Sequence, residues 1–305
     1  LADHSPPSDV LFLPPGRAAH RGSVHDAGYR PGAADFIPTD EPLVLIASHV
    51  AESGDGLVWC GLNGEKRRGI RSLGAGGGWC GAERLARDAG PMADASVYAY
   101  LATGWKNTFE LRTLPAGEVI HSMEVDTPGE IHCLGVAVHN RLLAATLSPV
   151  RVRDEVQRAT DQGGKQSSSQ SWGLLLLFDT VARKPLGTLP LLGVGGVTFD
   201  DQGRLFVVVN NQIVKLEGLD RQRSAPLTDV PLTKLTGHSA LSDPRQLMFD
   251  SGELFVADHG TSHQIHVLDT QGRELRTIGR PGGAKLGAYQ QDAMQKPAGM
   301  TIDSR

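Results

Sequence analysis

The sequence predicts an all-β protein, a β-propeller of four-stranded antiparallel blades, and three observations support this prediction. The chain of 305 residues contains 37 glycines and 18 prolines, which suits many short strands joined by tight turns better than long helices. Hairpin-like segments recur at a nearly constant interval in the C-terminal half, and two further apolar runs follow each hairpin. Four-stranded units that repeat at roughly 40 to 60 residues are typical of propeller blades.

The clearest repeats are three segments, at residues 195–209, 245–259 and 298–303. Each begins with a short apolar run that ends in an aspartate, and these aspartates, Asp200, Asp250 and Asp303, are 50 and 53 residues apart. In the first two segments a Gly-containing turn leads into a second run, and a third and a fourth follow, as in "HQIHVLD" and "ELRTIG". Alternation in "QIHVLD" places Ile265 and Val267 on one face of a strand. We therefore expect each unit to be a four-stranded meander.

The repeat sets the expected blade boundaries. Blades are expected at residues 42–74, 81–125, 134–192, 195–236 and 244–279, with residues 297–305 beginning the next. Residues 1–41 are expected to be an N-terminal loop or strap, and residues 148–172, rich in Gly, Ser and Gln at their end, an insertion in a surface loop. This gives about five blades plus the first strand of a sixth. We expect the natural chain to continue past Arg305 and to form six blades when complete.

Composition narrows the class of partner. A formal net charge of -4 gives no basic footprint for nucleic acid, so no nucleic-acid partner is expected. The longest apolar run, residues 173–178, is far shorter than the roughly 20 residues that a membrane-spanning helix needs. The three cysteines show no metal-knuckle spacing, although a Cys60–Cys80 disulfide stays open. "GGGWCG" at 76–81 fits the dinucleotide fingerprint, but no βαβ unit follows it, so a glycine-rich loop is the preferred interpretation.

The last complete unit resembles an NHL repeat. The residues that carry this resemblance are "DPRQLMFDSGELFVADHGTSHQIHVLDTQGRELRTIG" and the following "KPAGMTID", over roughly residues 243–303. The unit at 195–236 follows the pattern more loosely, with Asn210 where the pattern has Asp. The chain also resembles uncharacterised, exported bacterial proteins of planctomycete kind with NHL-type units. The resemblance implies a binding scaffold for protein, RNA or small ligands, while a minority of related six-bladed propellers are metal-dependent lactonases or lyases.

Candidate site residues gather between the second and third strands of the last unit. Asp258, His259, His263 and His266 offer four N or O ligands within nine residues, which suits Zn²⁺ or another divalent metal such as Ca²⁺. The alternative is a structural role, because Asp and Ser side chains in such a loop hydrogen-bond exposed main-chain N–H groups. We favour the structural role and expect no metal. His132 and His238, which lie ahead of expected inner strands, are further ligand-binding candidates.

No nucleophile, base and orienting residue can be grouped from the sequence. The favoured function is therefore a noncatalytic scaffold that binds a protein or a surface polysaccharide, in an extracellular or periplasmic setting. The alternative is a metal-dependent, lactonase-like hydrolase or lyase with ligands around the central channel. A repeat spacer within a longer surface protein is a third possibility.

Overall fold

Strands account for nearly all of the regular structure. The computed structural model describes residues 9–12, 20–23, 31–37, 43–48, 57–61, 65–70, 82–88, 97–103, 108–114, 118–125, 131–149, 172–219, 227–236, 241–283, 292–294, 296–297 and 299–301. These residues form strands and one short 3₁₀ helix, η1 (Leu227–Asp229), which confirms the all-β class. No helix within this part of the chain has the length and apolar character needed to cross a membrane. The chain divides into two compact units, residues 1–122 with 298–305 and residues 123–297.

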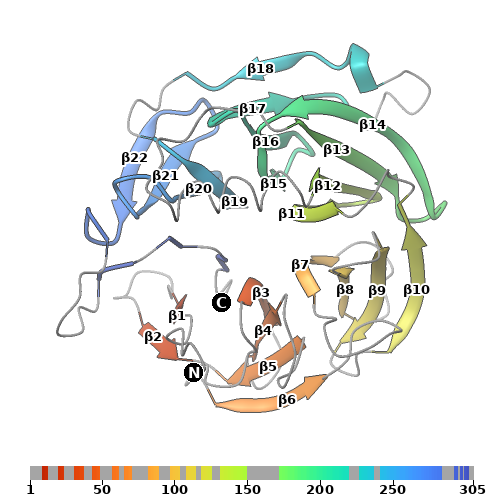
Figure 1. Ribbon diagram of the computed structural model, residues 1–305, viewed down its shortest axis with the longest axis horizontal. Helices are drawn as coiled ribbons and strands as arrows, with labels where there is room; N and C mark the ends of the chain where they lie inside the picture. Colours follow the sequence, from red (N-terminus) through yellow and green to blue (C-terminus); the bar gives the residue numbers. More distant parts are fainter. Residues whose placement is uncertain are drawn as a thin grey trace. The chain divides into compact units, whose positions relative to one another are not determined.

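The first unit holds one small sheet and two four-stranded sheets (Figure 1). The small sheet pairs β1 (Asp9–Phe12) with β2 (His20–Ser23). The next sheet has the order β3 (Pro31–Ile37), β4 (Leu43–Ser48), β5 (Leu57–Gly61) and β6 (Lys66–Ile70). The last has the order β7 (Ala82–Asp88), β8 (Val97–Thr103), β9 (Thr108–Leu114) and β10 (Val119–Glu124), with the final two residues of β10 falling in the second unit.

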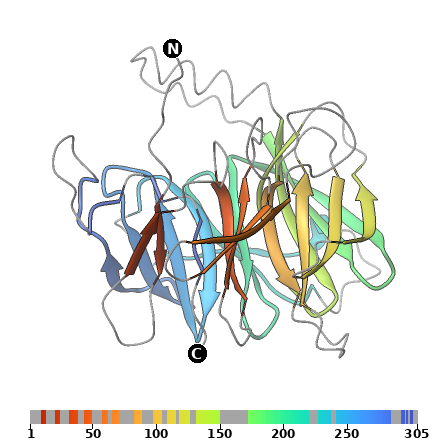
Figure 2. The same cartoon turned by 90° about the horizontal axis from the view of Figure 1, so that it is seen from below.

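The second unit holds three four-stranded sheets, each with its strands in sequence order and every neighbouring pair antiparallel. Their strands are β11 (Ile131–His139), β12 (Leu142–Pro149), β13 (Trp172–Asp179) and β14 (Lys184–Leu192); β15 (Val194–Phe199), β16 (Leu205–Val209), β17 (Gln212–Leu216) and β18 (Leu232–Lys234); and β19 (Pro244–Asp250), β20 (Glu253–Asp258), β21 (Ile265–Asp269) and β22 (Glu274–Ile278). Figure 2 shows the blue strands of the last sheet side by side. These are the meanders that the repeat predicts.

Strands also occur where the sequence predicted an N-terminal loop or strap. β1, β2 and β3 all lie within residues 1–41, so this expectation is wrong for the described part of that segment. Proline is tolerated as the first residue of a strand, and Pro31 holds that place in β3, with a register shift between Pro31 and Ala33. Phe36 and Ile37 then pair with Val44 and Leu43 of β4. The surrounding glycines and prolines concealed this strand.

Other expectations fall partly outside the described residues. Most of the 148–172 insertion lies outside them, as do Cys80 and residues 71–81. The segment after that glycine-rich stretch is β7, which pairs antiparallel with β8. Of the segment expected to begin a sixth blade, residues 297 and 299–301 are described and carry no strand.

Apolar side chains pack the sheets of the second unit face to face. Along β16, Leu205 and Val207 belong to a core cluster shared with the sheet β11–β14, whereas Phe206 and Val208 belong to a cluster shared with the sheet β19–β22. Successive residues of a strand point to opposite faces, so this central strand is buried on both sides. The rings of Phe206 and Phe249 stack with centroids 6.4 Å apart in the second cluster.

The first strands of neighbouring sheets approach closely through glycine. A Cβ atom on Gly196 of β15 would lie 2.7 Å from Gln246 Cα and 2.8 Å from the Arg245 carbonyl oxygen, both in the main chain of β19. On its other side, β15 is hydrogen-bonded to the sheet β11–β14, because the Gly195 carbonyl accepts the hydroxyl of Thr146 on β12 at 2.5 Å. Glycine is required at position 196 because the facing main-chain atoms cannot move aside as a flexible side chain can.

Two turns use one local sequence, Asp-x-Gln-Gly-Arg. At 200–204 the carboxylate of Asp200 accepts the N–H groups of Gln202 and Arg204 at 3.0 and 2.8 Å. At 269–273 the carboxylate of Asp269 accepts the two equivalent N–H groups, both at 2.9 Å. In each turn the arginine side chain returns to the same carboxylate. These aspartates shape turns, although Asp200 follows the first strand of its sheet and Asp269 is the last residue of the third strand of another.

Candidate functional site

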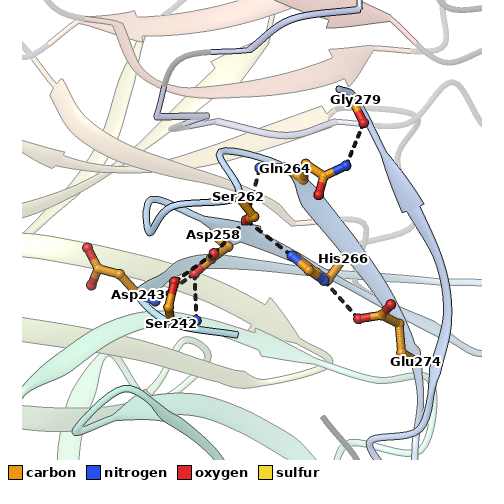
Figure 3. A network of polar contacts seen from close by, with 8 residues as sticks. All are labelled: Ser242, Asp243, Asp258, Ser262, Gln264, His266, Glu274 and Gly279. Carbon is orange, nitrogen blue, oxygen red and sulfur yellow. Dashed lines mark hydrogen bonds and ion pairs between the residues drawn. The ribbon is translucent and has the colours of Figure 1, made fainter. Parts of the chain in front are cut away.

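A connected group of polar side chains lies at one end of the last sheet (Figure 3). Its centre is Asp258, the last residue of β20, whose side chain is 0% exposed. A buried apolar run, Leu254–Ala257, brings the carboxylate to this position. The loop of residues 259–264 then returns the chain to β21, and the N–H of Asp258 donates to the Gln264 carbonyl at 2.9 Å to close it.

Both oxygens of Asp258 accept hydrogen bonds from the protein. Oδ1 accepts the main-chain N–H groups of Asp243 at 2.6 Å and Ser242 at 3.2 Å. Oδ2 accepts the hydroxyls of Ser262 at 2.6 Å and Ser242 at 3.3 Å. Burial by itself raises the pKa of Asp258, but the hydrogen bonds from Ser262, Asp243 and Ser242 outweigh it, so this pKa is lowered. The ionised carboxylate therefore fastens the start of β19 to the end of β20.

His266 extends this group along β21. Its side chain is 2% exposed, with Nδ1 2.8 Å from Glu274 Oε2 and Nε2 3.3 Å from Ser262 Oγ. Gln264 adds a further tie across the sheet, because its side-chain N–H donates to the Gly279 carbonyl at 2.6 Å. The polar group thus joins all four strands of the last sheet.

The order Glu274, His266, Ser262 matches that of an orienting acid, a base and a nucleophile. The hydroxyl proton decides what the arrangement can do. Ser262 has one proton to donate, and the Asp258 carboxylate lies 2.6 Å from its oxygen whereas His266 lies 3.3 Å away. The proton therefore points to the carboxylate, and His266 is not placed to withdraw it. The geometry fixes a loop rather than activating a nucleophile.

His259 makes a different contact. Its main-chain N–H donates to the Asp243 carbonyl at 2.9 Å, and its Nε2 lies 2.9 Å from the Pro297 carbonyl oxygen. Burial lowers the pKa of His259, and the cations Arg245 and Lys296 lower it further, against opposing effects of the Pro297 carbonyl and Asp243. The neutral ring thereby ties the returning segment 296–297 to the last sheet.

His263 occupies a strained turn. Its φ angle is 50°, in the left-handed region, and its N–H donates to the Gly260 carbonyl at 3.3 Å. Its Nδ1 atom is buried without a hydrogen-bond partner. Gly260 is held close to the polar group, since a Cβ atom there would lie 1.7 Å from Ser242 Oγ.

The candidate site residues that the sequence indicates therefore do not form a single group. Asp258 and His266 are joined through Ser262, whereas His259 and His263 make their contacts elsewhere. His132 lies at the start of β11 and takes no part in this polar group, and His238 lies outside the described residues. Within the part of the chain that the structure describes, no three His, Cys, Asp or Glu side chains are grouped so that they could hold a metal ion.

Sequence reasoning missed Ser242 and Glu274, and it gave Ser262 only a general hydrogen-bonding role in the loop. Ser242 and Asp258 are 16 residues apart, and only the pairing of β19 with β20 brings them together. Glu274 reaches His266 across the β21–β22 pair, where the register shifts between Val267 and Leu268. The local sequence carries no signal for that shift. The role of Ser262 could be foreseen in kind, because the side chain of a loop serine, here three residues before a strand, commonly accepts main-chain N–H groups.

No protein-family model and no curated protein match the chain. Solved structures do match it. Kuenenia stuttgartiensis hydrazine synthase is 12% identical, with a TM-score of 0.53 over 92% of this chain and 79% of that one. A chain of a nidogen/laminin complex is 14% identical, with a TM-score of 0.54 over 88% and 92%. A protein of unknown function from Bacteroides caccae is 11% identical, with a TM-score of 0.47 over 77% and 72%.

At such identities the first two likenesses show the fold alone. Together with the repeated four-stranded antiparallel sheets, they decide the architecture. The fold is a β-propeller. Each four-stranded sheet of this propeller is one blade, and the polar group around Asp258 belongs to the blade β19–β22.

Proposed function

We propose that this propeller is of the NHL type and serves, without catalysis, as a scaffold that binds a protein or a surface polysaccharide. We further propose that the propeller is six-bladed and works outside the cytoplasm, as in the exported bacterial proteins that it resembles. The NHL resemblance of residues 243–303 supports this proposal. In the blade that carries the resemblance, the aspartate of "LFVAD" is Asp258.

One observation carries the noncatalytic part of the proposal. Both oxygens of Asp258 accept hydrogen bonds from main-chain and hydroxyl groups, and the side chain is 0% exposed. Using this carboxylate as a metal ligand or a general base would disrupt its hydrogen bonds with these N–H and hydroxyl groups, and a hydrogen bond to a charged group contributes about 1.5–3 kcal/mol. Asp258, the acid next to this loop, therefore holds the loop in place through its hydrogen bonds.

The exposed tip of the loop is then the part available to a partner. Thr261 is exposed on the rigid turn that Gly260 and His263 form. Binding residues are often found on loops that a rigid scaffold positions, because little conformational entropy is lost on association. Gln271, in the turn at the other end of β21, is also exposed and provides a matched control.

The test is a ligand search in two arms, a displayed peptide library and an array of surface polysaccharides, with the purified chain as the probe. A ligand whose affinity falls on Thr261→Lys but not on Gln271→Lys supports the proposal. Elemental analysis and lactone hydrolysis are measured on the same protein. One bound ion per chain together with turnover abolished by Asp258→Asn would overturn the proposal in favour of the metal-dependent hydrolase.

A further inference from the structure

The fourth strand of each blade is an outer edge strand, and exposed edges invite pairing with another chain unless the sequence blocks it. Four of the five outer strands in the described blades carry such blocks. β6 has Lys66, Arg67 and Arg68; β14 has Pro185 and Pro190; β18 is only three residues long and ends in Lys234; β22 alternates charge at Glu274 and Arg276. Charge, proline and shortness are the usual means of protecting an edge.

The remaining outer strand, β10, is six residues long and has a single charged residue, Glu124, at its end. Its sequence is "VIHSME", with no proline and no charge before Glu124. Val119 is 48% exposed and Ile120 is 39% exposed, so two successive apolar side chains are solvent-accessible on this edge. Leu275 of β22 is similarly exposed, at 45%, but it lies between Glu274 and Arg276.

The hydrogen bonds to β9 determine which main-chain groups of β10 face outward. Glu118 faces β9, because its carbonyl accepts the N–H of Thr113 at 2.9 Å and its own N–H donates to the Thr113 hydroxyl at 3.1 Å. Main-chain groups alternate in direction along an antiparallel strand. The N–H and C=O groups of Val119, His121 and Met123 are therefore on the outer edge of the blade.

We propose that this edge of β10 docks an extended segment of a partner protein by strand addition, and that the segment is apolar in its middle and basic at both ends. Strand addition takes its affinity from main-chain hydrogen bonds and its specificity from side chains. The exposed acids Glu118 and Glu124 flank the apolar part of the edge. Cations opposite these two acids would complete an antiparallel pair.

A second copy of this chain is a poorer occupant. When two β10 strands pair antiparallel about His121, Glu118 of each copy faces Glu124 of the other. Like charges directly opposite each other destabilise a strand pair. The charge pattern therefore favours a basic partner over self-association. This inference goes beyond the proposed function, because it concerns a different blade from the one that carries loop 259–264 and does not depend on that loop.

The test uses the full chain and a fluorescent, capped peptide, KVTVTVK, whose length equals residues 118–124. Fluorescence anisotropy should show saturable binding that falls by about tenfold or more for Ile120→Lys, and by a similar factor when the peptide ends are glutamate, since each change removes several contacts. Leu275→Lys, a matched change on the protected strand β22, should leave the affinity unchanged. His121→Pro is a second variant that should weaken peptide binding. Proline is tolerated on the outer side of an edge strand, but it removes one outward N–H donor.

Hydrogen exchange gives an independent readout, in which peptide binding should protect the amides of Val119, His121 and Met123. Equal affinity in the wild type and the Ile120→Lys variant, or no saturable binding up to about 1 mM peptide, would overturn the proposal. Concentration-dependent dimers of the wild type that Ile120→Lys abolishes would also overturn it, since the occupant would then be a second copy. A ligand sensitive to Thr261→Lys alone would bear on the proposed function and not on this edge.

Discussion

The hydroxyl of Ser262 donates to Oδ2 of Asp258 at 2.6 Å, which fixes the loop between β20 and β21 to the end of β20. The same hydroxyl oxygen lies 3.3 Å from His266 Nε2. One loop side chain thus links a buried acid to a buried base of the next strand. Two of the four side chains with metal-binding potential in the sequence, Asp258 and His266, are thus hydrogen-bonded to one serine within the blade β19–β22.

Removing the central acid should destabilise the protein strongly. Asp258→Ala leaves the N–H groups of Ser242 and Asp243 without their acceptor, and we expect the free energy of unfolding to fall by about 3 kcal/mol. Urea unfolding followed by circular dichroism measures the change. Asp250→Ala is the matched control at the end of β19, where a partly exposed aspartate should cost no more than about 0.5 kcal/mol. Equal effects of the two substitutions would contradict the role given to Asp258.

Because Gly260 lies close to Ser242, substitutions at these two residues should have non-additive effects on the free energy of unfolding. Gly260→Ala places a Cβ atom 1.7 Å from Ser242 Oγ, so Ser242 must move away from Asp258, at a cost of about 1–3 kcal/mol. In the double variant with Ser242→Gly this clash is absent, and the additional cost of Gly260→Ala should largely vanish. A double-mutant cycle in urea unfolding measures the coupling. Additive effects would show that the two residues do not meet as described.

The left-handed conformation of His263 predicts an order of stability. With φ at 50°, His263→Gly should be more stable than His263→Ala by about 1 kcal/mol, because glycine adopts this conformation without a Cβ conflict. Thermal unfolding of the two variants tests the difference. If alanine proves at least as stable as glycine, the turn does not have this conformation in solution.

The lowered pKa of His259 predicts a loss of stability in mild acid. The unfolded chain takes up a proton as the pH falls below about 6.5, while the folded protein resists protonation of this buried ring, so stability falls as the pH decreases through that range. The lowered pKa of Asp258 acts at lower pH, because its contribution is lost only as the pH falls through the folded-state value, below about 4. Melting temperatures between about pH 8 and about pH 5 separate the effect of histidine protonation from that of Asp258. His259→Gln, which keeps an N–H donor for the Pro297 carbonyl, should flatten this dependence, and an unchanged slope would assign it to other groups.

The structure agrees with the sequence-based predictions for elements that short local patterns determine. Apolar alternation and the Asp and Gly of each turn predict the meanders, because these features act within a few residues, as the two turns closed by Asp200 and Asp269 illustrate. The strand Pro31–Ile37 was missed, because Pro31 and Gly32 at its start are typical of loops, whereas its pairing partner β4 lies further along the chain. In the candidate site, Asp258 and His266 were identified but their partners Ser242 and Glu274 were not, since those contacts depend on strand register.

The structural role of Asp258 and His266 is tested most directly by measuring whether the wild-type chain binds a metal ion. If Asp258 and His266 hold the blade, the melting temperature should be unchanged by EDTA and by Zn²⁺ or Ca²⁺ at about 1 mM, because a ligand stabilises only a protein that binds it in the folded state. The contradictory result is a melting temperature that rises with one of these ions in the wild type but not in the Asp258→Asn variant.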